Sequence, residues 1–183
     1  MALVNKNTSN IVTLNLVIDS KGWLSIPNIE PLIKKAVRAA IKNLPSKLVS
    51  KIRNTEITVL LTTNHSIQQL NHDFRGMDKP TNVLSFPQFE KSEILSRTVS
   101  SIKDSLGDIA IAYQYVKKEA RLQNKSLENH LTHLVIHGFL HLLGFDHISN
   151  HDAKIMESLE IRIMHSMRLA NPYHELYDSN HGA

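Results

Sequence analysis

The chain has 183 residues, of which 42% are hydrophobic, and it carries a formal net charge of +4 but no cysteine. Its length favours a single domain over residues 1–183, and the lack of cysteine excludes disulfides and thiolate sites, so any metal must be bound by histidine or carboxylate. Residues 1–10 lack the apolar run of a signal peptide and no segment approaches ~20 consecutive apolar residues, so we expect a cytoplasmic protein without a membrane span.

Hydrophobic periodicity predicts the helices and strands. Stretches rich in β-branched residues predict strands, and apolar residues recurring every three or four positions predict helices. In chain order the predicted elements are a strand over 11–18, a helix over 31–44, a strand over 56–62, a helix from 63 or 64 to about 74, strands over 83–86 and 106–113, and helices over 114–122, 127–143 and 152–169. The strands 83–87 and 106–113 suit an antiparallel pair. This order predicts an α+β fold, a small mixed four-stranded sheet with packed helices.

Three stretches fall outside this pattern. Residues 88–105 are polar and show no clear period, so we expect a mobile connection there. The two ends, 1–10 and 171–183, are expected to be loose. No internal repeat or low-complexity linker divides the chain, which supports a single domain.

The segment from His137 to His147 carries the clearest chemical pattern. His137 and His141 are four residues apart, so their side chains lie on the same face of the predicted helix. Gly144 can end this helix in the left-handed conformation and let the chain turn back, which brings His147 to the same point. Three neutral imidazoles with one open position are the ligand set of a catalytic zinc rather than a structural one. Nickel or cobalt would also be accepted by three histidines.

Two nearby residues have open roles. His133 is eight residues before His141, which corresponds to about 12 Å along a helix axis. Metal–nitrogen bonds are only about 2.0–2.1 Å long, so His133 and His141 cannot bind the same ion. Because His147 follows the end of the helix, it can reach the pair nearest that end, which is His137 and His141, rather than His133 and His137. His133 either supports a ligand, contacts substrate or is an ordinary core histidine. Asp146 either orients an imidazole by a hydrogen bond or shapes the turn.

The spacing H-x3-H-x2-G-x2-H is also that of the metzincin proteases. In those enzymes a glutamate follows the first histidine and acts as general base, whereas this chain has Gly138 there. No carboxylate is available at that point to activate a metal-bound water for peptide hydrolysis. Gly138 therefore disfavours a protease, while hydrolysis with a different helper remains open.

Arg75 is the candidate helper, in a loop that Gly76 and Pro80 predict. A guanidinium beside a metal suits a phosphodiester, because it can bind developing negative charge with two hydrogen bonds. The alternative is an ordinary surface arginine. The mild positive charge of the chain is compatible with nucleic acid but does not require it.

These residues together resemble the signature of the YbeY family, bacterial endoribonucleases of rRNA maturation. The resemblance covers about 55–170, with Phe145 in place of a common tyrosine. Its blocks are His137-Gly138-x-Leu140-His141-Leu142-Leu143-Gly144-Phe145-Asp146-His147, Leu70-Asn71-x-x-Phe74-Arg75-x-x-Asp78-x-Pro80-Thr81-Asn82-Val83-Leu84-Ser85-Phe86-Pro87 and Leu106-Gly107-Asp108-Ile109.

The resemblance implies a zinc-dependent endoribonuclease specific for single-stranded RNA. In this family three histidines hold the zinc, which here match His137, His141 and His147, and Arg75 matches an arginine needed for function, expected to act on substrate phosphate. It also implies processing of the 3′ end of small-subunit rRNA, ribosome quality control, and RNA and the small ribosomal subunit or its proteins as partners. Two alternatives remain: a ribosome-assembly binding factor with a mainly structural zinc, and a zinc metalloprotease or other zinc hydrolase, which Gly138 disfavours.

Overall fold

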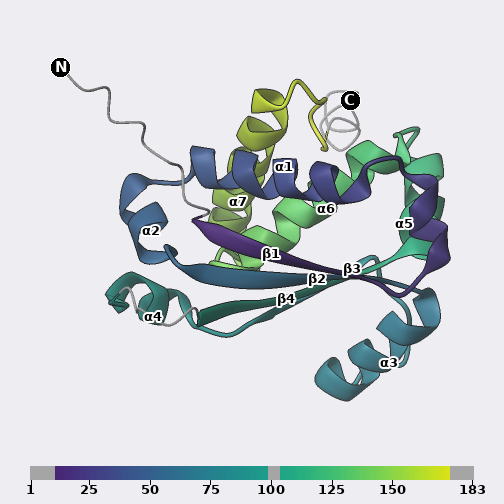
Figure 1. The fold of residues 1–183 in the computed structure, drawn as a ribbon, viewed down its shortest axis with the longest axis horizontal. Coiled ribbons are helices and arrows are strands. Elements are labelled where there is room, and N and C mark those ends of the chain that lie inside the picture. The colour runs from purple at the N-terminus through teal and green to yellow at the C-terminus, as the bar shows by residue number, and fades with distance from the viewer. Residues whose placement is uncertain (1–10, 99–103, 174–183) are drawn as a thin grey trace.

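A mixed sheet of four strands forms the centre of the computed structural model, which describes residues 11–98 and 104–173 (Figure 1). The strands lie in the order β1-β2-β4-β3; β1, β2 and β4 are parallel, and β3 runs antiparallel to β4 at one edge. The strands are β1 Val12–Ile18, β2 Thr55–Thr62, β3 Val83–Pro87 and β4 Asp104–Ala112. The predicted α+β class and mixed four-stranded sheet are confirmed, as is the antiparallel pairing of β3 with β4.

Helices cover both faces of the sheet. In Figure 1, α1, α6 and α7 pack together on one side of it, while α3 lies on the other side. The helices are α1 Ile29–Asn43, α2 Ser46–Lys51, α3 Asn64–Arg75, α4 Lys91–Ser96, α5 Tyr113–Leu122, α6 Leu127–Leu142, α7 Asn150–Ser166 and the 3-10 helix η1 Lys21–Ser25. All five predicted helices are present within a few residues. The short elements η1, α2 and α4 were not predicted, because five or six residues are too few to display a helical period.

Two groups of buried apolar side chains hold these layers together. The larger group fills the space between the sheet and the helices α1, α6 and α7, and the smaller one lies under α3. Strand β4 contributes to both groups, with Ile109 and Ile111 on one face and Ala110 and Ala112 on the other. Apolar residues at consecutive positions, which point to opposite faces, are typical of a strand that is buried on both faces.

Helix α6 is the most buried helix among the described residues, with ten of its residues buried. Ser126 caps its start by accepting a hydrogen bond from the backbone N–H of Asn129 at 3.1 Å. Its end agrees with the prediction, since Gly144 adopts φ +75°. The N–H groups of Gly144 and Phe145 bond back to the carbonyls of His141 and Leu140, which forms a Schellman motif.

Two segments that were expected to be mobile or loose form defined contacts in the residues that the structure describes. Within 88–105, α4 forms behind a capping box between Glu90 and Glu93 and buries Ile94 completely. After residue 170, Pro172 is buried and its carbonyl accepts a hydrogen bond from Lys125 at 2.6 Å. In both places one apolar contact and a few hydrogen bonds order a segment whose composition alone looks polar. Residues 1–10, 99–103 and 174–183 lie outside the described residues.

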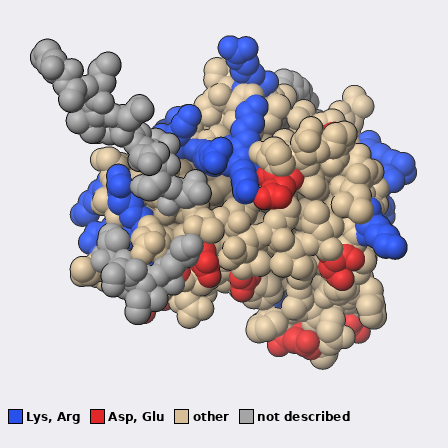
Figure 2. Space-filling view, viewed as in Figure 1, with Lys and Arg blue, Asp and Glu red and all other residues tan. Residues whose placement is uncertain are grey.

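The charged side chains are unevenly distributed over the surface. Figure 2 shows basic side chains gathered over α1 on this face, while acidic side chains lie lower, near the sheet and α3. The basic residues of α1 are Lys34, Lys35, Arg38 and Lys42. Over the described ranges, none of the helices has the length and apolar character needed to cross a bilayer.

Candidate metal centre

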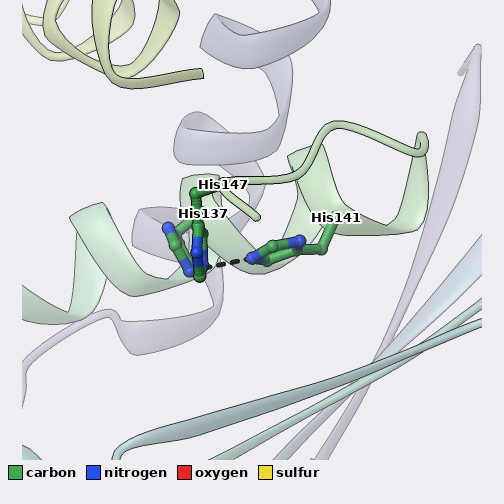
Figure 3. Close-up of side chains that lie close together, drawn as sticks. All are labelled: His137, His141 and His147. Atoms are coloured by element: carbon green, nitrogen blue, oxygen red, sulfur yellow. Dashed lines mark hydrogen bonds between the residues drawn. The ribbon is translucent and has the colours of Figure 1, made fainter. Parts of the chain in front are cut away.

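Three histidines converge at the end of α6 (Figure 3). His137 and His141 project from consecutive turns of the helix, and His147 comes from the loop that leads to α7. The Nε2 atoms of His137 and His141 are 3.1 Å apart, and one ring nitrogen of each histidine lies within 4.8 Å of the other two. Two ligands of a tetrahedral ion with bonds of about 2.0–2.1 Å are about 3.3 Å apart. The donor set and its spacing therefore fit one metal ion.

The turn after α6 places His147. A side chain at Gly144 would approach Cβ of Lys91 to 2.6 Å, and its φ of +75° is a further reason for glycine. One carboxylate oxygen of Asp146 accepts a hydrogen bond from the backbone N–H of His147 at 2.7 Å. Of the two roles considered for Asp146, this contact corresponds to shaping the turn.

Burial and neighbouring imidazoles keep His141 neutral. Burial, together with the neighbouring imidazoles of His137 and His147, lowers the pKa of His141 from 6.5 to about 4. The carboxylate of Asp146 opposes this shift but does not cancel it. Because only a neutral imidazole binds a metal, His141 is in its binding form at neutral pH.

The metal-free protein should lose stability as the pH falls from about 6.5 to about 4. The folded-state pKa of His141 lies below its unfolded value of 6.5, so the unfolded chain takes up the proton first and acid favours unfolding. This contribution to stability is complete above pH 6.5. Urea unfolding of chelator-treated protein across this range measures it, and His141→Gln should reduce the pH dependence. An equally steep dependence in that variant would contradict the assignment.

Glu160 lies beside His137, one of the three histidines, and was not predicted from the sequence. It comes from α7, is 0% exposed, and its two oxygens each meet a histidine. Oε1 lies 2.8 Å from Nδ1 of His137, and Oε2 lies 2.8 Å from Nε2 of His133. The hydroxyl of Tyr173 also donates to Oε2. The sequence offered one signal for Glu160: it directly follows Leu159, which belongs to the apolar residues of the last helix that pack inward.

The pKa values in this group have defined directions. Burial raises the pKa of Glu160, but the hydrogen bonds from His133 and His137 outweigh burial and bring it down to about 2. Burial lowers the pKa of His133, and this effect exceeds the opposing influence of Glu160. Glu160 is therefore a carboxylate at neutral pH and His133 is a neutral imidazole. His133 contacts Glu160, which in turn contacts His137, and it is absent from the lining of the cleft described next.

The histidines open into a cleft of about 650 Å³. Arg75, the last residue of α3, lines the same cleft and is exposed. Its guanidinium forms no hydrogen bond or ion pair with any residue that the structure describes. Gly76 ends α3 with φ +68°, and the side chain of Asn71 donates to the carbonyl of Lys79 at 2.8 Å, which fixes the following loop. The structure therefore brings the predicted arginine and histidines into one cleft.

Gly138 packs against the sheet. A Cβ at this position would lie 2.8 Å from Cγ2 of Ile109 and 3.2 Å from Oγ of Ser85. The position that carries glutamate in the metzincin proteases is therefore filled by β4 and β3 in this fold. A glutamate side chain has no room there, so packing as well as sequence excludes a general base at this position.

Gly138→Ala should lower stability by about 1 kcal/mol, although alanine gains up to about 1 kcal/mol of helix propensity. The new methyl must displace Ile109, whose Cγ2 is close to its own backbone, and overpacking of this kind costs about 1–3 kcal/mol. Thermal unfolding measures the change. Combining it with Ile109→Ala, which removes the clashing methyl, should cost less than the sum of the two. A raised melting temperature in Gly138→Ala would contradict this packing.

The fold and the cleft define a class: α+β proteins with a three-histidine candidate metal centre at the end of a buried helix. The family model described as Endoribonuclease YbeY matches residues 20–168. The chain belongs to the YbeY endoribonuclease family. The resemblance noted from the sequence motifs is thereby confirmed.

Individual relatives agree over most of the chain. The chain is 39% identical over 165 residues to the endoribonuclease YbeY of Bradyrhizobium sp. strain BTAi1, covering 90% of this chain and 94% of the relative. It is 42% identical over 163 residues to that of Francisella philomiragia, covering 89% and 97%. The solution structure of TM1509 from Thermotoga maritima is similar with a TM-score of 0.53 and 25% identity, over 85% of this chain and 92% of that one.

Proposed function

We propose that this protein is a zinc-dependent endoribonuclease that cleaves single-stranded RNA in the histidine cleft. The observation that carries the proposal is the convergence of His137, His141 and His147 in one open cleft with Arg75. The relatives are named endoribonucleases, which supports RNA as the substrate. We further propose, from what the motif resemblance implies, action on the 3′ end of small-subunit rRNA and in ribosome quality control, with the small ribosomal subunit or its proteins as partners, in the cytoplasm.

In this proposal the three imidazoles hold the metal, and the remaining chemistry is divided between residues of the cleft. A bound zinc supplies Lewis acidity and a water of lowered pKa. Arg75 binds the scissile phosphate, since its guanidinium is exposed, lines the cleft and has no internal partner among the described residues. The planar, positively charged guanidinium stabilises the negative charge that develops on the phosphate oxygens during cleavage. The neutral form of His141 keeps its nitrogen available to the metal.

The test is cleavage of a labelled single-stranded RNA by the purified full chain, with and without chelator. We expect cleavage that the chelator stops and that added zinc restores, while a fully paired duplex of the same sequence resists. A peptide library incubated in parallel should remain intact. Chelator-insensitive cleavage, or hydrolysis of peptides but not of RNA, would overturn the proposal. Ribosome association without any nuclease activity would support an assembly factor instead.

A further inference from the structure

A buried carboxylate needs a reason in a protein core, because removal of its charge from water is costly unless it is paired and hydrogen-bonded. Glu160 has no exposed surface and lies among the apolar side chains with which α7 packs on α6. Its partners are His137 and His133, each at 2.8 Å, and the hydroxyl of Tyr173. The carboxylate is held by three hydrogen-bonding partners rather than by apolar packing alone, which points to a task beyond packing.

The hydrogen bonds of Glu160 specify the tautomer of His137. An ionised carboxylate only accepts hydrogen bonds, so Nδ1 of His137 must carry the ring proton. In the neutral ring, Nε2 is then the unprotonated nitrogen, and this is the atom that lies 3.1 Å from Nε2 of His141 inside the candidate metal centre. Metal-bound histidines commonly donate their other N–H to a carboxylate, which fixes the tautomer and the ring orientation.

We propose that Glu160 is a positioning residue that prepares His137 for the metal. His133 and Tyr173 bond to the second carboxylate oxygen, so the carboxylate cannot rotate and its first oxygen stays on Nδ1 of His137. His133, His137 and Glu160 also lie within 4.8 Å of one another, and these hydrogen bonds account for that second cluster without a second ion. The inference rests on the metal site of the proposed function.

The chain offers a matched control in a second pair, in which His130 of α6 meets Glu119 of α5. Nε2 of His130 lies 2.9 Å from Oε2 of Glu119, and the histidine is only 4% exposed. This pair has the same chemistry as the pair of Glu160 with His133, but neither member belongs to the candidate ligand cluster. Glu119→Gln therefore removes a carboxylate from a buried histidine without touching the candidate ligands.

The experiment compares zinc affinity and thermal unfolding of the full-length wild type, Glu160→Gln and Glu119→Gln. A glutamine amide has one accepting oxygen and one donating nitrogen, so in Glu160→Gln one of the two histidines must change its tautomer, turn or lose its partner. We expect Glu160→Gln to bind zinc about 10–100-fold more weakly. Glu119→Gln should bind zinc as the wild type does, with a lowered melting temperature.

A spectroscopic readout needs no variant. Nitrogen-15 spectra of metal-free wild type labelled at histidine should show the proton of His137 on Nδ1. A proton on Nε2 would overturn the inference even if Glu160→Gln fails to fold. Wild-type zinc affinity in a folded Glu160→Gln protein would overturn it while leaving the metal site intact. A wild type that binds no zinc would overturn both the metal site and this inference.

Discussion

Replacing His141 with alanine should abolish metal binding and RNA cleavage together. Two of the three nitrogens that lie within 4.8 Å of one another remain in this variant, which is too few to close a tetrahedral site with one open position. Loss of the several kcal/mol that a metal contributes to charge stabilisation corresponds to a fall in rate of about a thousandfold or more. Metal content of the purified protein and single-turnover cleavage of single-stranded RNA measure the two effects.

His165→Ala is the matched control for this variant, because His165 is exposed near the end of α7 and lies outside the cleft. It should retain both metal and activity. A metal-free His141→Ala protein that cleaves RNA at the wild-type rate would show that the proposed chemistry is wrong.

Arg75→Glu should keep the metal and lose cleavage. The guanidinium lines the cleft but is absent from the histidine cluster, so its replacement leaves the candidate ligands in place. Removal of one donor that stabilises developing charge costs about a hundredfold to a thousandfold in rate, and reversal of the charge should cost at least as much. Arg75→Lys should retain part of the activity, since lysine keeps the charge but cannot bind a phosphate through two parallel N–H groups.

Arg53→Glu separates this role from general attraction to RNA. Arg53 is exposed after α2 and does not line the cleft, so the variant has the same change in net charge. It should weaken RNA binding slightly, in a salt-dependent manner, and should leave the rate at saturating RNA unchanged. Equal losses of that rate in the two variants would remove the specific role of Arg75.

The sequence predicted those parts of the fold and site that depend on local spacing. The position of His141 four residues after His137, with Gly144 three residues later, was sufficient to predict that a third histidine returns to the helix end. Long elements were predicted because their apolar residues repeat often enough to show a period. The motif blocks also predicted that Arg75 belongs with the histidines, although about sixty residues separate them in the chain.

The parts that were not predicted depend on packing between distant segments. Glu160 lies beside His137 only because α7 packs against α6, and no local spacing records that contact. The order of the strands and the burial of Ile94 by α4 have the same origin. The two roles of Asp146 also needed the structure, because both fit the same position in the sequence.

The three histidines differ in how firmly the fold holds them. His137 and His141 project from a helix that is buried along most of its length, whereas His147 is exposed on the loop between α6 and α7. The helix fixes the spacing of His137 and His141 before any ion arrives. Most of the conformational entropy lost on metal binding is therefore lost by the loop that carries His147. An ion should therefore enter by docking on the pair and leave by first releasing His147. If the proposed metal site is right, we expect the turn at Gly144 and Asp146 to govern the lifetime of a bound ion.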